Sequence, residues 1–370
     1  MASTPVDPEV REAMLPWLDV AAAGNPHSEH PAGWRAAKAV TDARAAVAAL
    51  IGAQPAEVVF TSGATEANNI ALLGAGREIG RVAVSAIEHP SVIEPAADLR
   101  AQGVTVETLP VDGAGRVDLG ALERFLGQGR ALVSVMAANN EIGTFQPIAE
   151  IGALCRRFGA LFHSDAVQMA AVAPIDFGAA AIDLLSLSGH KLYGPSGIGA
   201  LYVRGGVPLR PLVHGGGQER AVRPGTVPVA LCVALGTACR LAAERRDADH
   251  ARIAALRERL FAALRERLAD LRRNGPDSGG HPGCLNVTLP GLDAADLLLD
   301  LPDLAVSTGS ACSALSGSPS HVLRAIGLSA EEAHGSLRFG LGRGTTEAEV
   351  DAAAAQIIAA LRDRGHPGVR

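Results

Sequence analysis

Short apolar runs rich in β-branched residues alternate with longer stretches of helical periodicity through the first 226 residues of the chain. Helices are predicted over 66–73, 89–102, 119–127 and 147–158. The runs with the length and apolar content of buried strands are 58–60, 81–85, 105–109, 131–137, 160–163, 184–186 and 199–203. This alternation predicts an α/β fold in which βαβ units build a mostly parallel, doubly wound sheet.

The pattern becomes mainly helical after residue 226. Residues 227–273 are rich in Ala, Leu, Glu and Arg, and they predict two helices, the second over 252–273 with alternating charge. Glycine and proline then interrupt the chain, and a compact α/β segment follows that ends in a helix over 346–363. We place a domain junction near residue 248. The expected domains are a large one over 8–247 and a smaller one formed by 1–7 and 248–370.

The composition is that of an ordinary globular protein: 370 residues, of which 48% are hydrophobic and 19% charged. The net charge of -6 and the 3% aromatic content argue against nucleic acid or an anionic membrane as the main partner. No run approaches the roughly 18 apolar residues of a membrane helix, and residues 1–8 lack the basic region and apolar core of a signal peptide. We therefore expect a cytoplasmic protein that contacts neither membrane nor nucleic acid directly.

The five cysteines form neither a CxxC pair nor a Cys/His metal spacing, and their odd, scattered set fits a reducing cytosol. Cys155, Cys232 and Cys239 lie in apolar stretches, which predicts buried side chains. Cys312 instead lies among small polar residues. This setting predicts an exposed and mobile thiol that can meet a second site or a partner protein, although an adventitious surface cysteine is the alternative.

Only two of the 33 basic Lys and Arg residues are lysines, Lys38 and Lys191. Lys191 lies in a loop that carries Ser188 and His190. A guanidinium stays protonated, whereas a desolvated lysine can lose its proton and attack a carbonyl. Lys191 therefore suggests Schiff-base chemistry with an aldehyde such as pyridoxal phosphate. The alternative is a surface lysine, which is how we interpret Lys38 in its helix-like run.

A predicted strand, a turn of small residues and a predicted helix meet at 61–66, which is the geometry of a phosphate cradle. Ala64 and Thr65 would offer the backbone donors of this turn. The alternative is an ordinary helix cap in which Ser62 or Thr65 is the capping residue.

Polar side chains follow two further predicted strands. Asp165 and Gln168 come at the end of one, where a carboxylate could keep a pyridine nitrogen protonated and an amide could contact a phenolic oxygen. His89 lies at a boundary between a loop and a helix and could stack on a planar ring. A helix cap is the alternative for Asp165, and a capping or core histidine is the alternative for His89.

Two arginine-bearing segments indicate anion binding. The glycine-dense stretch 214–226 ends in Thr226 and could supply anion contacts, or it could be a surface loop. Arg338 lies within an apolar, strand-like run. A buried lone charge is costly, so this guanidinium needs an anionic partner: a substrate carboxylate held by two hydrogen bonds, or a structural ion pair.

The motifs occur in a fixed order along nearly the whole chain: SGATEANN, EHPS, NNEIG, SDAVQ, SLSGHKLYGP, HGGGQER, RPGT, TGSACSA and SLRFGLGR. In this order they closely resemble those of the cysteine desulfurases, pyridoxal phosphate enzymes of the class V, aminotransferase-like group. The resemblance implies the fold type I of pyridoxal phosphate-dependent transferases, with a mostly parallel seven-stranded sheet in the large domain and a smaller α/β domain. It also implies removal of sulfur from L-cysteine, which gives L-alanine and an enzyme persulfide, by a homodimer.

The resemblance further assigns roles around the cofactor. Lys191 would hold pyridoxal phosphate as a Schiff base, Asp165 would pair with the pyridine nitrogen, and Gln168 would contact the phenolic oxygen. His89 would stack on the ring and serve as an acid or base near the substrate thiol. The residues expected at the phosphate are Ala64, Thr65, Ser188 and His190, together with Thr226 from the other subunit.

For the substrate, the resemblance places Asn140 and Arg338 at the carboxylate and makes Cys312 the nucleophile. The segment after Cys312 resembles family members with a long cysteine-bearing loop, which deliver sulfur to iron–sulfur scaffold proteins or to tRNA or DNA modification systems. A protein acceptor is therefore expected.

Three alternatives stay open from the sequence. A selenocysteine or cysteine-sulfinate lyase and a class V aminotransferase would use the same cofactor. A non-catalytic subunit of a sulfur-transfer complex is suggested only by the lack of the short strand with which family members usually begin.

Overall fold

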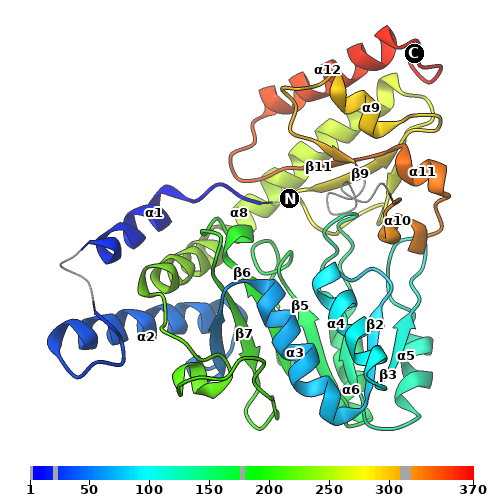
Figure 1. The fold of residues 1–370 in the computed structure, drawn as a ribbon. Coiled ribbons are helices and arrows are strands. Elements are labelled where there is room, and N and C mark those ends of the chain that lie inside the picture. The colour runs from blue at the N-terminus through cyan, green and yellow to red at the C-terminus, as the bar shows by residue number, and fades with distance from the viewer. Residues whose placement is uncertain (1–2, 20–23, 176–179, 309–317) are drawn as a thin grey trace.

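The computed structural model describes residues 3–19, 24–175, 180–308 and 318–370. Two sheets organise these residues, a large one that carries most of the helices and a small one beside its upper edge in Figure 1. Within the described residues, no helix combines the length and the apolar character needed to cross a membrane.

The large sheet has seven strands in the order β1-β7-β6-β5-β4-β2-β3. β7 runs antiparallel to both neighbours, and the remaining pairings are parallel, so the predicted mostly parallel α/β sheet is confirmed. Every predicted strand is present, with ends shifted by a few residues. The strands are β1 (Val58–Thr61), β2 (Arg81–Ser85), β3 (Thr105–Leu109), β4 (Leu132–Ser134), β5 (Leu161–Asp165), β6 (Leu184–Ser188) and β7 (Gly199–Val203).

Helices cover both faces of this sheet because its strands are apolar on both sides. Val59 faces a core formed with α3 (Ala64–Ile79) and α4 (Pro90–Ala101). The next residue, Phe60, faces the opposite core, since neighbouring side chains on a strand point to opposite faces. The helices that build this second core are α2 (Pro31–Ile51), α5 (Leu119–Leu126), α6 (Ile148–Arg157) and the first half of α8 (Val229–Arg267).

The prediction of two helices over 227–273 is wrong, because α8 is one continuous helix of 39 residues. Its sequence contains no proline, and the helix formers Ala, Leu, Arg and Glu continue through residue 248. Leu235 in its first half packs in the core of the large sheet, whereas Leu260 in its second half packs in the core of the small sheet. α8 thus runs from one sheet to the other (Figure 1). The proposed domain limits stay a prediction.

The small sheet is antiparallel, in the order β10-β11-β9-β8. Its apolar face packs on α8, α9 and α12 (Figure 1), and the predicted last helix is confirmed as α12. The strands are β8 (Arg272–Asn274), β9 (Cys284–Thr288), β10 (Ser307–Thr308) and β11 (Ser336–Gly340), and the helices of this region are α9 (Ala294–Leu299), α10 (His321–Ala325), α11 (Ala330–His334) and α12 (Glu347–Asp363). The N-terminal segment leads into α1 (Pro8–Met14) and the 3-10 turn η1 (Leu15–Leu18).

Candidate active site

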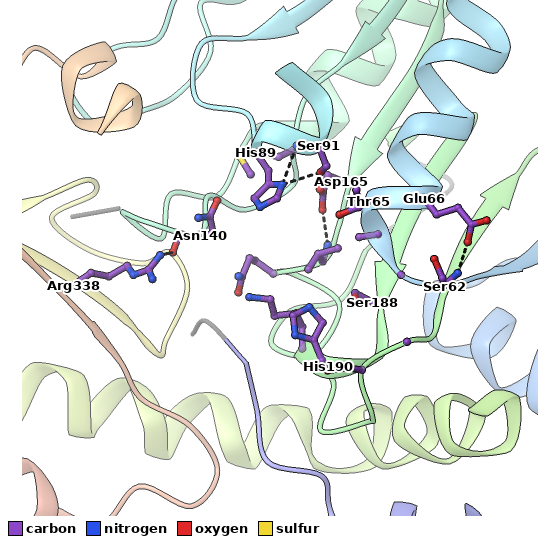
Figure 2. A pocket seen from close by; sticks show the side chains of 18 residues that line it. Ser62, Thr65, Glu66, His89, Ser91, Asn140, Asp165, Ser188, His190 and Arg338 are labelled. Carbon is purple, nitrogen blue, oxygen red and sulfur yellow. Dashed lines mark hydrogen bonds between the residues drawn. The ribbon is translucent and has the colours of Figure 1, made fainter. Parts of the chain in front are cut away.

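A cavity of about 450 Å³ opens where the parallel strands of the large sheet end. The loops after β1, β2, β4, β5 and β6 all reach it, as expected for a ligand site at the carboxyl edge of such a sheet. The predicted site residues that line it are Ala64, Thr65, His89, Asn140, Asp165, Gln168, Ser188, His190, Lys191 and Arg338. In Figure 2, Ser62, Thr65 and Ser188 lie on one side, Asn140 and Arg338 on the other, and His89 and Asp165 between them.

The turn before α3 has the form of an anion cradle. Gly63 is the N-cap with φ 152°, and it offers no capping side chain to the first N–H groups of α3. The capping roles considered for Ser62 and Thr65 are therefore not found. β7 passes close beneath the turn, since a Cβ on Gly199 would lie 2.7 Å from the Gly63 Cα. A helix N-terminus without a side-chain cap, in a turn of small residues, suits a phosphate group.

Glu66 in the first turn of α3 is tied away from the cradle. Its carboxylate accepts hydrogen bonds from the Ser62 N–H and from the Arg223 Nε, the latter at 3.0 Å. Burial alone would raise the pKa of Glu66, but these two hydrogen bonds outweigh it and lower the pKa below its ordinary value. The carboxylate is thus charged and compensated by Arg223, which limits its repulsion of an anion at the cradle.

Asp165 ends β5 with 6% of its surface exposed. Its Oδ1 accepts from the Val167 N–H at 3.0 Å, and turns follow β5 there, so Asp165 caps a turn and not the helix considered for it. Its Oδ2 accepts from the Asn68 Nδ2 at 2.8 Å. The carboxylate also lines the cavity, where a protonated ring nitrogen would find a charged acceptor.

His89 is the N-cap of α4 and lines the cavity at the same time. Its Nδ1 accepts from the Ser91 N–H at 3.1 Å and lies 2.8 Å from the Ser91 Oγ. Burial lowers the pKa of His89, and Lys191 and His321 lower it further, whereas Asp165 acts in the opposite sense. The imidazole is therefore neutral at physiological pH.

Asn68 and Ser91 connect His89 to Asp165, and sequence reasoning gave neither of them a role. Both lie inside the motifs SGATEANN and EHPS. Their side chains face the site only because α3 and α4 pack side by side on one face of the sheet. Their position within those motifs was the available signal, but a motif does not show which way a side chain faces.

Lys191 ends the 3-10 turn η4 (Gly189–Lys191) directly after β6 and lines the cavity. The other lysine, Lys38, is exposed on α2 and pairs with Asp42 at 2.7 Å, so the surface interpretation of Lys38 is confirmed. Lys191 is thus the only lysine of the chain at this site.

The N-terminal segment braces the loop that carries Lys191. The Thr4 N–H donates to the His190 carbonyl at 2.9 Å, and the Tyr193 N–H donates to the Thr4 Oγ1 at 2.9 Å. Asp7 continues this bracing, because its N–H donates to the Tyr193 carbonyl and its carboxylate pairs with Arg343 at 2.8 Å. Tyr193 has φ 61°, an unfavourable conformation for a bulky residue, and these contacts hold it there.

Arg338 projects from β11 and is 7% exposed. Its Nε donates to the Ser307 Oγ at 3.2 Å, and its Nη1 donates to the Asn140 carbonyl at 3.3 Å. Among the described residues the guanidinium pairs with no carboxylate, so the structural ion pair considered for it is not found there. A buried guanidinium at a cavity wall that holds only two long hydrogen bonds is suited to an anionic ligand.

Four cysteines are buried: Cys155, Cys232, Cys239 and Cys284. Burial raises the pKa of each of the first three to about 12, which makes them poor nucleophiles. The predicted filler role of these three is confirmed. Cys312 lies outside the described residues.

Residues that flank the Cys312 segment contact the cavity wall. Ser307 accepts from Arg338 on one side of the segment. On the other side, Ser320 donates to the buried Glu141 carboxylate at 2.6 Å, next to Asn140. Thr226 is exposed and is not among the residues that line the cavity of its own chain.

Known proteins resemble this chain over almost its whole length. The aminotransferase class-V family model matches residues 1–353. The cysteine desulfurase of Mus musculus is 48% identical over 364 residues, covering 96% of this chain and 79% of that protein. The structure of a NifS-like protein shares 34% identity and a TM-score of 0.90, covering 98% of both chains. The structure titled SspA in complex with cysteine shares 37% identity and a TM-score of 0.82, covering 93% of this chain and 98% of that chain.

These matches confirm the resemblance drawn from the motifs and extend it to the fold. The large, mostly parallel sheet and the small second sheet are the architecture of pyridoxal phosphate enzymes of fold type I. The chain therefore belongs to the aminotransferase class-V family and, within it, to the cysteine desulfurases, a group of pyridoxal phosphate-dependent enzymes.

Proposed function

We propose that this protein removes sulfur from L-cysteine with pyridoxal phosphate as cofactor, releases L-alanine and stores the sulfur as a persulfide on Cys312. The observation that carries the proposal is the convergence of Lys191, Asp165, His89 and Arg338 on one cavity from four separate elements. An amine, a carboxylate, an imidazole and a guanidinium are the groups that a pyridoxal phosphate enzyme acting on an amino acid needs.

Residues around the cavity are suited to the different groups of the cofactor. The uncapped N-terminus of α3 at Gly63 suits the phosphate, and the buried Asp165 carboxylate suits a protonated pyridine nitrogen. Lys191 would hold the aldehyde carbon, Gln168 would contact the phenolic oxygen, and His89 would lie against the ring. The phosphate would be held by Ala64, Thr65, Ser188 and His190, and by Thr226 of the partner subunit in a homodimer.

Bound there, pyridoxal phosphate supplies an electron-poor pyridinium that delocalises negative charge from the substrate carbon skeleton. Arg338 and Asn140 orient the substrate by its carboxylate, and Asp165 keeps the ring nitrogen protonated. The Lys191 amine would also carry protons to and from the substrate carbons. His89 faces the substrate thiol.

Cys312 performs the sulfur transfer as a thiolate. Its sulfur forms a bond to the substrate sulfur while the bond between that sulfur and the substrate Cβ breaks. The electron pair of the broken bond stays with Cβ, and a proton added there completes the methyl group of alanine. Cysteine and an enzyme thiol thus become alanine and an enzyme persulfide, and no outside oxidant or reductant is needed.

The persulfide on Cys312 is then available to an acceptor protein. A thiol in a stretch of small polar residues suits delivery to a second protein, such as an iron–sulfur scaffold or a sulfur carrier. We propose that this transfer takes place in the cytoplasm, because the odd, scattered set of cysteines fits a reducing compartment.

Changing Cys312 to Ala tests the proposed nucleophile. We expect alanine release from L-cysteine to fall roughly 10³-fold or more, while the cofactor absorbance of the purified protein stays. Cys155→Ala, which removes a buried thiol, is the matched control and should keep wild-type turnover. Normal turnover by the Cys312→Ala enzyme would exclude the role given to this thiol.

The same variant separates the alternative functions. If the wild-type enzyme strongly prefers selenocysteine to cysteine and Cys312→Ala keeps the selenocysteine activity, the protein is a selenocysteine lyase, because selenium leaves without thiol attack. Turnover that requires a keto acid would indicate an aminotransferase. A wild-type enzyme inactive on all these substrates would indicate a non-catalytic subunit.

Changing Arg338 to Gln tests the carboxylate site. We expect KM for L-cysteine to rise about 10- to 100-fold with a much smaller change in kcat, because a charge-assisted pair that binds ground state and transition state alike is lost. Steady-state alanine release measures both constants. Arg257→Gln is the matched control, since Arg257 is a buried arginine that binds the His281 carbonyl outside the cavity. An unchanged KM in Arg338→Gln would contradict the assignment.

A further inference from the structure

Four polar side chains form a continuous hydrogen-bonded chain along one wall of the cavity. The Asn68 Nδ2 donates to the Asp165 Oδ2 at 2.8 Å and to the Ser91 Oγ at 2.8 Å. The Ser91 Oγ in turn lies 2.8 Å from the His89 Nδ1. Asn68 has no exposed surface, and Ser91 and Asp165 are 8% and 6% exposed, so water does not compete with these bonds. The chain joins α3, α4 and β5 around two residues assigned to the cofactor.

The direction of each hydrogen bond in this chain follows from its Asp165 end. A carboxylate accepts only, so the Asn68 amide presents its NH₂ group to Asp165, and both hydrogens of that group are used, one on Asp165 and one on Ser91. The Ser91 Oγ is therefore an acceptor toward Asn68, and its own hydrogen is free to point to the His89 Nδ1. The Ser91 N–H, which can only donate, points to the same nitrogen.

The surroundings of His89 also disfavour a proton on Nδ1. His89 caps the 12-residue helix α4, whose N-terminal N–H groups repel a positive ring. The charged and titratable groups that face it are Asp165 from β5, Lys191 from η4 and His321 from α10. Burial lowers the pKa of His89, and Lys191 and His321 add to this effect, while Asp165 opposes it without reversing it.

We propose that Asn68 and Ser91 are positioning residues that hold His89 as the neutral tautomer with its proton on Nε2. Nδ1 is occupied by Ser91, so Nε2 is the ring nitrogen left for a ligand in the cavity. His89 then meets its ligand as a hydrogen-bond donor through its Nε2–H, and does not begin as a base. The identity of that ligand rests on the proposed function, in which it is the substrate sulfur. The assignment of the tautomer does not depend on the proposed function.

The chain orients His89 but does not relay protons to it. Asn68 lies between Ser91 and Asp165 in this chain, and a side-chain amide does not transfer a proton from one neighbour to the next. Nδ1 therefore receives no proton from Asp165, and His89 presents its Nε2–H to the cavity. His89 can stabilise a substrate thiolate from this edge by donating Nε2–H to the sulfur.

The tautomer can be measured directly on the cofactor-loaded enzyme labelled with ¹⁵N-histidine. We expect the His89 ring, assigned by its absence from the His89→Gln spectrum, to show a protonated Nε2 and an unprotonated Nδ1 at neutral pH. A ring protonated on Nδ1 would overturn the proposal, whether or not the enzyme is active. Absence of turnover with the expected tautomer would instead count against the proposed function alone.

Variants of Ser91 give a second, independent readout. Ser91→Ala removes a donor to the neutral ring, so the pKa of His89 should rise, and the midpoint of the His89 titration followed by ¹⁵N NMR should move to higher pH. We expect a shift of about one pH unit for the loss of one hydrogen bond, with Asn68→Ala shifting the midpoint in the same direction. Ser91→Thr keeps the hydroxyl and should restore the wild-type titration.

Ser164→Ala is the matched control for these variants. Ser164 is also a buried serine and precedes Asp165, but its hydroxyl donates to the Val135 carbonyl at 2.8 Å, outside the hydrogen-bonded chain. This variant should leave both the tautomer and the His89 titration unchanged. A Ser91→Ala enzyme with the wild-type tautomer and the wild-type His89 titration would show that Ser91 has only a structural role.

Discussion

Replacing Lys191 with alanine is expected to abolish alanine release from L-cysteine, with a loss of at least about 10³-fold, and to remove the visible absorbance of the bound cofactor. The proposed roles of this amine are covalent attachment and proton transfer, and proton transfer alone commonly contributes 10²- to about 10⁴-fold. No other amine can substitute, because the second lysine, Lys38, is exposed on α2 and paired with Asp42. Alanine assays and the visible spectrum of the purified protein measure both effects.

Two companion variants sharpen this test. Lys191→Arg keeps a positive charge but cannot form a bond to an aldehyde, so it should be as inactive as the alanine variant. Lys38→Ala should keep both turnover and spectrum. Wild-type absorbance in Lys191→Ala would mean that the cofactor is held elsewhere, and the proposed chemistry would then fail.

The general position of the site could be predicted from the sequence because it follows from strand ends. Asp165 and Lys191 lie at the ends of apolar runs far apart in the chain. Once those runs pair in parallel as β5 and β6, their carboxyl ends must meet at one edge of the sheet. The same logic brings the turn at Gly63, after β1, to this edge. The hydrophobic pattern and the residues that flank each predicted strand were therefore sufficient to predict the sheet and most of the residues that line the cavity.

Contacts that depend on helix packing could not be predicted. The sequence pattern of α8 does not reveal that one helix packs in two hydrophobic cores. Its apolar residues recur along the whole helix, although the first half packs against the large sheet and the second half against the small sheet. The link from Asn68 to Ser91 needs the relative rotation of α3 and α4, which a single sequence does not specify. The bracing of the Lys191 loop by Thr4 joins residues more than 180 positions apart, and no local pattern indicates it.

Residues before and after Cys312 in the chain are hydrogen-bonded to the cavity wall. Arg338, proposed for the substrate carboxylate, already donates to Ser307 just before the Cys312 segment. Glu141, beside the proposed carboxylate residue Asn140, accepts from Ser320 just after it. Ser307 and Ser320 are thus both hydrogen-bonded to the wall that is proposed to bind the substrate.

Changing Asp165 to Asn is expected to lower kcat roughly 10²- to 10³-fold while the cofactor stays attached through Lys191. The carboxylate is buried and already accepts from Asn68 and from the Val167 N–H, so its charge is held at one fixed place. An asparagine has the same size but cannot stabilise a protonated pyridine nitrogen. If its NH₂ group faced the Asn68 amide, two donors would oppose each other.

Asp183→Asn separates this loss of charge from the general cost of changing a buried aspartate. Asp183 is 5% exposed, accepts from the Phe162 N–H at 2.7 Å and pairs with Arg204, but it lies outside the cavity. Its replacement should lower the free energy of unfolding by about 1–3 kcal/mol and leave kcat unchanged. Asp165→Asn should show the reverse pattern, a large loss in kcat with a smaller change in thermal stability. If both variants lost stability alike and neither lost kcat, Asp165 would be a structural carboxylate. A carboxylate that acts on the cofactor ring should instead lower kcat in a protein that is still folded.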